Sequence, residues 1–361
     1  MRILITNVTF AELSGTVTFA RDLALELRRQ GHEPAIFSKP GRGIGADLRA
    51  AGIPVSQRLA SLPRPDVVHG HHRPVLLSAL HRWPGVPAIW VCHDHRSVFD
   101  ATPHHPSVRR YFGVSRVCVG RIVGDGVPAG EVELLPNFVD TARFVRRAPL
   151  SERPARALVF SNYASPSTHL PAVREACRRQ GLELDVVGAA AGRVAERPED
   201  LLGRYDLVFA KGRAAIEALC TGAAVLLCDA AGAGPMVSTR NVDALRSMNF
   251  GYEALTHPLS ADVIADAIRE YDKADASRAS GMLRSMAGVE AAVRRLVDVY
   301  AGVVRAHGNL SSRSAGGQAS SAWKERFQVR LLWAWWSTPL SLRETLRPLI
   351  RPVARRTLGV P

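Results

Sequence analysis

Apolar residues along this chain fall in short continuous runs that alternate with longer stretches of helical spacing. Residues 2–6 predict a strand, and the apolar residues of 20–27 then recur at the interval of a helix, which Gly31 ends. Strands that alternate with helices in this way indicate a parallel, doubly wound sheet. The remaining strands of this first series are predicted at residues 34–38, 66–69 and 88–92, within 114–128 and within 131–144, with helices near residues 46–51 and after Pro74.

The same alternation starts again at residue 157, after a segment rich in proline and charge at residues 147–156 that we interpret as a hinge. The predicted fold class is therefore α/β, with two Rossmann-like doubly wound domains, residues 1–146 and 157–307, that face a cleft. The strands of the second series are predicted at residues 157–160, 182–188, 207–210 and 224–228, and its later helices at residues 261–271 and 289–307.

The last part of the chain differs in composition. Residues 308–322 are rich in Gly and Ser, which is typical of a flexible linker. Residues 323–361 contain four of the six tryptophans and eight lysines and arginines against two glutamates. This basic amphipathic pattern predicts a helical tail that binds an anionic membrane surface. The alternative is that the tail packs its tryptophans onto the body of the protein.

Composition limits the class of protein. The chain has 361 residues, of which 47% are hydrophobic, so two domains can each bury a core. Its five cysteines are scattered through apolar runs without a CxxC pair, which indicates reduced core residues of a cytosolic protein. Because the sequence has neither a signal-peptide pattern nor an 18-residue apolar span, we expect a cytoplasmic location, with peripheral membrane binding through the tail. The formal charge is +14, but no nucleic-acid-binding motif accompanies it, so we expect no nucleic-acid partner.

Residues 205–251 carry the most informative motif. Around its two buried strands the motif predicts a tight turn at Gly212, a helix that carries Glu217, and a glycine loop that ends at Pro235. In such units the ligand lies beyond the carboxyl ends of the parallel strands, where helix N-termini can hold phosphate. A carboxylate one or two turns into the helix can accept hydrogen bonds from a ribose diol, so Glu217 is the candidate ribose ligand. The alternative is that Glu217 faces solvent and binds nothing.

Several stretches resemble the GT-B glycosyltransferases, and family 4 in particular. Residues 14–38 resemble the opening loop and helix of the family, with Gly15 in the place of its glycine pair. The resemblance covers residues 1 to about 307. Five further stretches, PDVVHGHH, WVCHDH, VSRVCVGRIV, LLPNFVDTARF and EALCTGAAVLLCD, resemble in that order its DVVHxH and xTxHD strand ends, its VS helix start, its PNGVDTxxF exit loop and its EAMAxGxPVVA motif.

The resemblance implies a retaining glycosyltransferase that uses a nucleotide-sugar donor as substrate and needs no bound metal or cofactor. The first domain would take a glycan or lipid-linked acceptor, and the second would take the donor. By this analogy Gly15 and Thr16 offer an amide to the diphosphate, and Glu217 holds the ribose. His93 would face the sugar across the cleft. Gly234, Pro235, Met236 and Val237 would lie along the sugar.

Two departures from the family pattern change the expected site. The first glutamate of the E-x7-E motif is replaced by Phe209, and the loop of residues 161–171 lacks the Arg and Lys that normally meet the donor diphosphate. Lys211 and Arg213, on either side of Gly212, are the candidates for meeting the leaving-group charge. The alternative for Lys211 is an ordinary solvated turn lysine.

Three alternatives stay open at this point. One is a metal site, because five histidines end two strands that we expect to be neighbours, although Asp94 is the only evident carboxylate partner. Another is a glycosyltransferase-like scaffold that has lost turnover, as the two departures permit. The third is a sugar-nucleotide epimerase on the same fold. A Ser-His-Asp hydrolase is not indicated, because GxSxG is absent. The five histidines are His69, His71, His72, His93 and His95.

Overall fold

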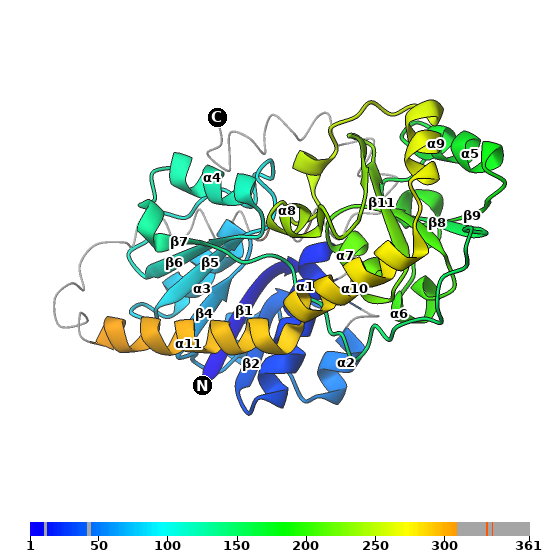
Figure 1. The fold of residues 1–361 in the computed structure, drawn as a ribbon. Helices are drawn as coiled ribbons and strands as arrows, with labels where there is room; N and C mark the ends of the chain where they lie inside the picture. The colour runs from blue at the N-terminus through cyan, green and yellow to red at the C-terminus, as the bar shows by residue number, and fades with distance from the viewer. Residues whose placement is uncertain (11–12, 42–44, 309–329, 331–333, 335–361) are drawn as a thin grey trace. The chain divides into compact units, whose positions relative to one another are not determined.

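The computed structural model describes residues 1–10, 13–41 and 45–308, together with Arg330 and Ala334. Within this part the chain forms two compact units (Figure 1). The first unit contains residues 1–135 and the described residues from 293 onward, and the second contains residues 136–292. The predicted linker and basic tail, residues 308–322 and 323–361, lie outside the described residues except at Gly308, Arg330 and Ala334.

The first unit is built on a seven-stranded parallel sheet with the strand order β3-β2-β1-β4-β5-β6-β7. The chain moves outward from β1 to β3 and then restarts on the other side of β1 with β4, so the predicted doubly wound topology is confirmed. The strands are β1 (Arg2–Thr9), β2 (Glu33–Lys39), β3 (Val55–Ser56), β4 (Val67–Gly70), β5 (Ala88–Cys92), β6 (Val108–Gly113) and β7 (Val132–Leu134). The helices are α1 (Gly15–Arg29), α2 (Gly45–Ala50), α3 (Arg73–Arg82) and α4 (Arg116–Gly124), with 3-10 turns η1 (Leu59–Ser61) and η2 (Ala129–Glu131).

One strand of the first unit lies outside the residues where it was predicted. The strand expected within residues 114–128 is β6, which has already ended at Gly113. The hydroxyl of Ser115 accepts a hydrogen bond from the Cys118 amide at 3.4 Å, so Ser115 caps α4 and the following apolar residues are helical. A Cβ on Gly113 would lie 2.5 Å from the Val119 amide nitrogen, so this glycine permits the close approach of β6 and α4.

The second unit has a five-stranded sheet in the order β12-β11-β10-β8-β9, in which only the edge strand β12 is antiparallel. The predicted glycine loop ending at Pro235 is wrong, because these residues form β12. Its strands are β8 (Arg156–Phe160), β9 (Glu183–Val187), β10 (Leu207–Ala210), β11 (Ala224–Asp229) and β12 (Gly232–Met236). Its helices are α5 (Leu170–Arg179), α6 (Glu199–Leu202), α7 (Gly212–Cys220), α8 (Val242–Ser247), α9 (Ala261–Arg269) and α10 (Lys273–Ala287), with 3-10 turns η3 (Ala189–Ala191) and η4 (Tyr252–Ala254).

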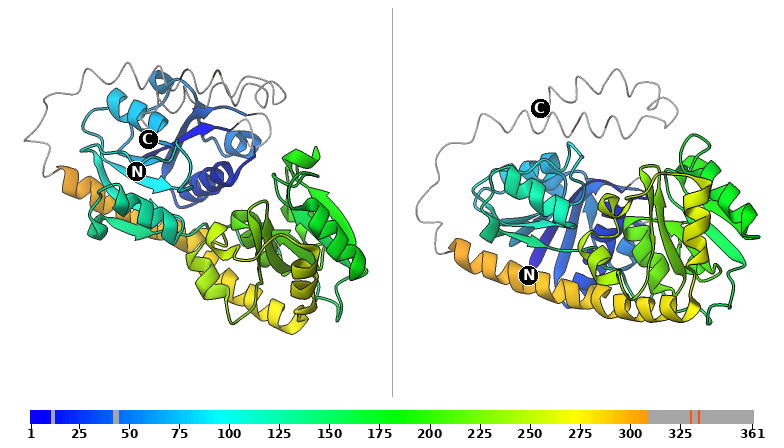
Figure 2. Two further views of the ribbon diagram at one scale, coloured as in Figure 1. Left: turned by 90° about the horizontal axis from the view of Figure 1, so that it is seen from above. Right: turned by 45° about the horizontal axis from the view of Figure 1, so that its top comes forward.

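The central strands of this unit divide their side chains between two cores. In β10, Val208 and Ala210 pack with α7, α8 and α10. Leu207 and Phe209 point to the opposite face and pack with α5 and α9. Both sets are fully buried, which explains why these strands are continuous apolar runs in the sequence. Figure 2 shows the green strands of this unit as one sheet between helices.

Helix α11 (Val289–Gly308) spans the boundary between the units, and the predicted domain limits differ from the observed ones there. Residues from 293 onward belong to the first unit rather than the second. The hydroxyl of Tyr300 lies 2.6 Å from Nδ1 of His69 in β4, and both side chains are fully buried. Arg295 also pairs with Glu133 of β7 at 2.5 Å.

The other domain limit shifts in the opposite direction. Residues 136–146, predicted in the first domain, belong to the second unit. The amide of Val139 donates to the carbonyl of Ala287 at 2.8 Å, and the side chain of Phe144 lies in the core with α7 and α10. The chain thus enters the second unit before the proline-rich segment that suggested a hinge. The boundary lies between Leu135 and Pro136, within the exit loop LLPNFVDTARF, and not in that segment. The cleft expected between the domains stays a prediction.

All five cysteines are buried, as expected of core residues. Among the described residues, none of the helices combines the length and the apolar character needed to cross a membrane.

Candidate functional site

The C-terminal ends of β8, β10 and β11 bring together an ion pair that the sequence did not predict. Lys211 follows β10, and its Nζ lies 2.7 Å from Oδ2 of Asp229, the last residue of β11. The other carboxylate oxygen of Asp229 lies 3.3 Å from the hydroxyl of Ser161, which follows β8, and accepts from the Ala230 amide at 2.7 Å. The side chain of Asp229 is 2% exposed, so its charge depends on these partners.

Two tyrosine rings flank the ammonium of Lys211. Its Nζ lies 4.3 Å from the ring centroid of Tyr252 and 5.3 Å from that of Tyr163, both within the range of cation–π attraction. Burial lowers the pKa of Lys211, but the adjacent carboxylate of Asp229 and the two tyrosines together raise it by more, so the net shift is upward. Lys211 is therefore charged and held in place, and the alternative of a freely solvated turn lysine is wrong.

His169 is a further polar neighbour of this ion pair. It is fully buried at the N-terminus of α5, and its Nδ1 lies 3.8 Å from Oδ1 of Asp229. Neither ring nitrogen has a hydrogen-bond partner among the described residues. Burial lowers the pKa of His169 and Lys211 lowers it further, against the opposing effect of Asp229. With His169 neutral, the cluster contains one positive and one negative charge.

The N-terminus of α7 begins next to Lys211. Lys211 is the N-cap residue and has extended backbone, and its side chain does not cap the helix. Gly212 has a φ of +58°, in the left-handed region that favours glycine, and a Cβ at this position would meet no atom within 4 Å. The amide of Gly212 donates to the carbonyl of Phe250 at 2.6 Å. The backbone therefore turns sharply beside open space, where the positive end of the α7 dipole favours an anion.

Glu217 and Arg213 form a second buried ion pair, within α7. Nε of Arg213 donates to Oε1 of Glu217 at 2.8 Å, and the two residues are 6% and 4% exposed. The alternative of a solvent-facing Glu217 is therefore wrong. The guanidinium of Arg213, which we expected to meet the leaving group, orients the Glu217 carboxylate in this structure.

The residues predicted to lie along the sugar mostly pack within the second unit. The side chains of Met236 and Val237 are buried in the two cores of the second unit. A Cβ on Gly234 would lie 2.4 Å from the carbonyl oxygen of Ala254, so the absence of a side chain is required by packing against η4. Pro235 is half-buried. These residues can offer a ligand backbone groups more readily than side chains.

The missing first glutamate has a physical explanation. Phe209 is fully buried in the core between the sheet and the helices α5 and α9, where it pairs with Leu226 and Val159 of the neighbouring strands. A glutamate at this position would place an unpaired charge in an apolar core. The loop of residues 161–171 contains no Arg or Lys, so Lys211 and α7 remain the candidates for binding an anion in the second unit.

Three histidines of the first unit are adjacent at the C-terminal ends of β4 and β5, as predicted. Nδ1 of His71 lies 2.7 Å from Nε2 of His93. Both rings pack against Phe19 of α1 in a T-shaped arrangement, with centroid distances of 5.3 Å and 4.9 Å. The ring of His69 lies 4.6 Å from that of His71. His93 is half-buried, whereas His69 and His71 are fully buried.

The other two histidines of the predicted group lie apart from these three. His72 has a φ of +56°, and its Nδ1 accepts from the Val8 amide at 3.2 Å. His95 lies 3.9 Å from Asp94. In the described part of the chain, no group of three His, Cys, Asp or Glu side chains is placed to hold a metal ion. The histidine cluster is thus a hydrogen-bonded and ring-packed group.

Burial determines the protonation of these histidines. It lowers the pKa of His69 to about 3 and that of His72 to about 4. The pKa of His71 is lowered well below its usual value, first by burial and then by the neighbouring histidines. All three are neutral at neutral pH.

We expect stability to fall as the pH drops below about 6.5, the pKa of histidine in an unfolded chain. Between that pH and about 4 the unfolded chain binds protons that the native protein does not, so each of these three histidines lowers the unfolding free energy by roughly 1 kcal/mol per pH unit. Denaturant titrations from pH 7 to pH 5 measure this slope. His72→Asn keeps an acceptor for the Val8 amide and tolerates the left-handed backbone, and it should reduce the slope. An unchanged slope would contradict a neutral His72.

The candidate diphosphate ligands of the first unit lie at the start of α1. The hydroxyl of Ser14 accepts from the Val17 amide at 3.3 Å, so Ser14 is the cap that begins the helix at Gly15. Gly15 is exposed and Thr16 is half-buried. Both precede the buried face of α1.

Sequence reasoning missed Asp229, His169, Tyr163 and Tyr252. Asp229 could have been identified from the sequence, because it is the single acidic residue at the end of an apolar strand in the motif of residues 205–251. The tyrosines and His169 could not, since they approach Lys211 from the loop after β8 and from η4, remote in sequence.

Comparisons with known proteins agree with this architecture. The model of Glycosyltransferase Family 4 matches residues 13–143. Anabaena Alr3699/HepE in complex with UDP-glucose is similar over 84% of this chain and all of its own, with 15% identity and a TM-score of 0.60. A glycosyltransferase from Rickettsia africae ESF-5 has 14% identity over 84% of this chain and 98% of its own, with a TM-score of 0.59.

Two further similar structures have lower TM-scores. Staphylococcus aureus MnaA with UDP has 14% identity over 82% of this chain and 94% of its own, with a TM-score of 0.50. A structure named UDP-N-acetylglucosamine 2-epimerase has 15% identity over 82% of this chain and 94% of its own, also with a TM-score of 0.50. No curated protein matches the sequence. The chain thus has the two-unit GT-B fold of glycosyltransferases, and its resemblance to family 4 is confirmed over residues 13–143.

Proposed function

We propose that the protein is a retaining glycosyltransferase that moves a sugar from a nucleotide-sugar donor to an acceptor without a bound metal. The observation that carries this proposal is the strand–helix connection after β10. There an ammonium, an open helix N-terminus and a buried carboxylate follow one another within residues 211–217. The family 4 match of residues 13–143 and the UDP-glucose complex of the similarly folded HepE support a donor of this class.

The leaving diphosphate gains negative charge during transfer, so the site must offer it cations or amides. The N-terminus of α7 supplies amides and a positive dipole end beside Gly212. Lys211 supplies an ammonium that Asp229 and two tyrosines fix in position. Because Asp229 offsets the charge of Lys211, the amides of α7 contribute more here than they would beside two unpaired cations.

Glu217 is assigned to the ribose, with Arg213 fixing the orientation of its carboxylate at 2.8 Å. In the first unit, His93 is assigned to the sugar, and the start of α1 at Gly15 to the diphosphate. His71 is neutral and hydrogen-bonded to His93, so it holds the His93 ring without adding charge. The acceptor is proposed to be a glycan or lipid-linked glycan, with the basic tail of residues 323–361 at an anionic membrane.

Two competing functions are outcomes of the same test. Phe209 in place of a glutamate and the absence of cations in residues 161–171 favour a scaffold without turnover. The similarity to a structure named UDP-N-acetylglucosamine 2-epimerase favours an epimerase. A scaffold would bind a partner and turn over no donor, and an epimerase would convert a nucleotide sugar in the absence of any acceptor.

The proposal predicts that one nucleotide sugar among UDP-, GDP- and dTDP-sugars raises the melting temperature, since a ligand that binds only the folded state stabilises it. Glu217→Gln should weaken donor binding by roughly tenfold or more. This corresponds to about 1.4 kcal/mol of binding free energy, which is the contribution expected of a hydrogen bond to a charged group. The variant also removes the counter-ion of Arg213, so its shift is measured against its own ligand-free melting temperature. Binding is then paired with a transfer assay that includes acceptor glycans.

The matched control is Glu270→Gln, which changes an exposed carboxylate of the second unit and should leave the shift unchanged. If no nucleotide sugar shifts the melting temperature, the donor proposal is wrong. If Glu217→Gln binds the donor as tightly as the parent protein, the ribose assignment is wrong while the transferase proposal stands.

A further inference from the structure

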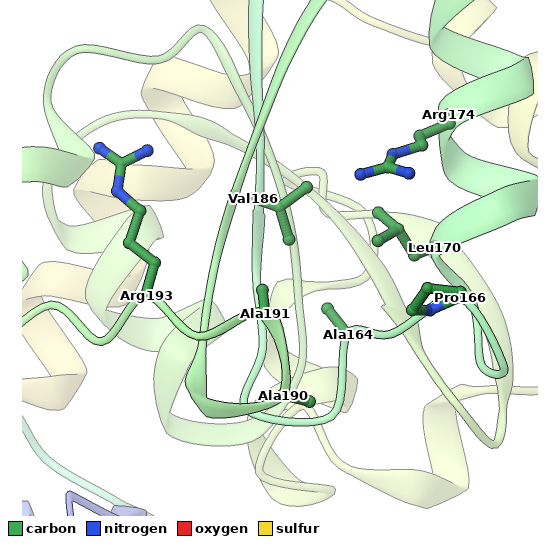
Figure 3. Close-up of a pocket in the computed structure, with 8 residues that line it drawn as sticks. All are labelled: Ala164, Pro166, Leu170, Arg174, Val186, Ala190, Ala191 and Arg193. Carbon is green, nitrogen blue, oxygen red and sulfur yellow. The ribbon is translucent and has the colours of Figure 1, made fainter.

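The second unit contains a cavity that is not lined by the candidate site residues described above. It has a volume of about 370 Å³ and lies between the first turns of α5 and the loops that follow β8 and β9 (Figure 3). This is the edge of the sheet where α/β folds place their ligands, because the C-terminal strand ends leave loops there. The lining residues are Ala164, Pro166, Leu170, Arg174, Val186, Ala190, Ala191 and Arg193.

The cavity combines an apolar floor with two cations. Leu170 and Ala164 are buried beneath it, and Val186 of β9 is half-buried. Figure 3 shows Arg174 and Arg193 on opposite sides of Val186, with the guanidinium of Arg174 extended over Leu170. An apolar surface beneath two planar donors suits a ligand that has both an apolar body and an anionic group.

The guanidinium of Arg174 has its hydrogen-bonding capacity available. Over the described residues it forms neither an ion pair nor a hydrogen bond. On the same helix, Arg178 and Arg179 both bind the carboxylate of Glu175, at 2.8 Å and 2.7 Å. In the described part of the chain, the guanidinium of Arg193 has one ion-pair contact, with Asp185 at 4.0 Å. The one acidic side chain of α5 is therefore committed away from Arg174, and the cavity keeps a net positive charge.

We infer that this cavity is a binding site for a small organic anion with a compact apolar body, held by Arg174 and Arg193. Its volume lies within the range of small-molecule sites, about 300–1,000 Å³. Guanidinium groups bind carboxylates and phosphates in a bidentate manner, so either can be the anionic group. Lys211, Asp229 and Glu217 do not line it. Ala164, Pro166 and Leu170 belong to the loop of residues 161–171, so competition with UDP distinguishes this cavity from the proposed donor site.

The test uses four probes that separate charge from shape. Phenyl phosphate and benzoate have both an anion and an apolar ring, benzamide has the ring without charge, and inorganic phosphate has the charge without a ring. In amide NMR spectra of the full chain, the first two should shift the signals of Ala164, Ala190 and Ala191 saturably. Benzamide and inorganic phosphate should bind at least tenfold more weakly. The stronger of the two anions identifies carboxylate or phosphate as the preferred group.

Arg174→Gln should weaken binding of the better anion at least tenfold. The matched control is Arg178→Gln, one turn further along α5, which removes an exposed arginine that does not line the cavity and should leave binding unchanged. Equal binding of benzamide, no effect of Arg174→Gln, or no shift with either organic anion would overturn the inference. Displacement of the probe by UDP would place it at the candidate donor site and would also overturn it.

Discussion

Replacing Lys211 by methionine should lower the free energy of unfolding by about 3–5 kcal/mol, because it leaves a buried carboxylate without its counter-ion. Asp229 is 2% exposed and its nearest cation is the Lys211 ammonium at 2.7 Å. Methionine preserves most of the apolar stem between Tyr163 and Tyr252, so the loss reports the charge rather than the packing. Denaturant unfolding at neutral pH measures the difference.

The double variant Lys211→Met, Asp229→Asn distinguishes this cause from a general packing defect. Replacing the unpaired carboxylate of Asp229 by a neutral amide should recover a large part of the lost stability. The expected coupling energy between the two positions is about 2 kcal/mol or more. Lys273→Met removes an exposed ammonium that pairs with Glu152 and should change stability by less than about 1 kcal/mol. Strictly additive effects of the two substitutions would contradict the ion-pair account.

The same pair of variants tests the role of Lys211 in donor binding. If its ammonium meets the diphosphate, the double variant should be folded and yet lose the donor-induced stabilisation. A folded double variant that binds a nucleotide sugar as tightly as the parent would leave the diphosphate to the amides of α7.

Gly234→Ala should destabilise the protein by about 3 kcal/mol, the upper part of the range for overpacking. The added Cβ would lie 2.4 Å from the Ala254 carbonyl oxygen and 2.9 Å from Cβ of Leu227. Both neighbours are fixed parts of the fold, η4 and β11, so β12 must move for the methyl group to fit. Thermal unfolding of the ligand-free protein measures this effect without any donor.

Gly281→Ala is the matched control, since a Cβ at this position of α10 would meet no atom within 4 Å. Alanine is favoured over glycine in a helix by about 0.5–1 kcal/mol, so this variant should be slightly more stable than the parent. If Gly234→Ala were as stable as the parent, the packing reason for this glycine would fail, and its interpretation as a sugar-facing residue would be strengthened.

Much of the fold could be read from local patterns. The strands at residues 88–92 and 207–210 were predicted with their observed limits, because strands buried on both faces are continuous apolar runs bounded by polar residues or glycine. β12 was missed because its glycines and proline resemble a loop, and its pairing with β11 depends on a partner elsewhere in the chain. Helix α10 was not predicted, since its buried face consists mainly of alanine and serine.

The candidate site could be located but not assembled from the sequence. The motif around Gly212 and Glu217 indicated the correct strand–helix connection, and the histidines at the ends of β4 and β5 were expected to be neighbours. The partner of each charge was not predictable: Lys211 pairs with Asp229, Arg213 with Glu217, and His71 with His93. These contacts decide which groups carry net charge and which are fixed in orientation.

The spacing of apolar residues along the chain was sufficient to predict the alternation of strands and helices and the doubly wound sheets. It also indicated the edge of the second sheet that carries the candidate site. This spacing involves residues that are close together in sequence. It predicts secondary structure because a helix or strand with one buried face needs apolar residues at the same intervals in any protein. The ion pairs, the antiparallel β12 and the return of α11 to the first unit depend on distances between segments far apart in sequence. Tyr300 and His69 meet only after both segments fold, so their contact is decided by packing in three dimensions.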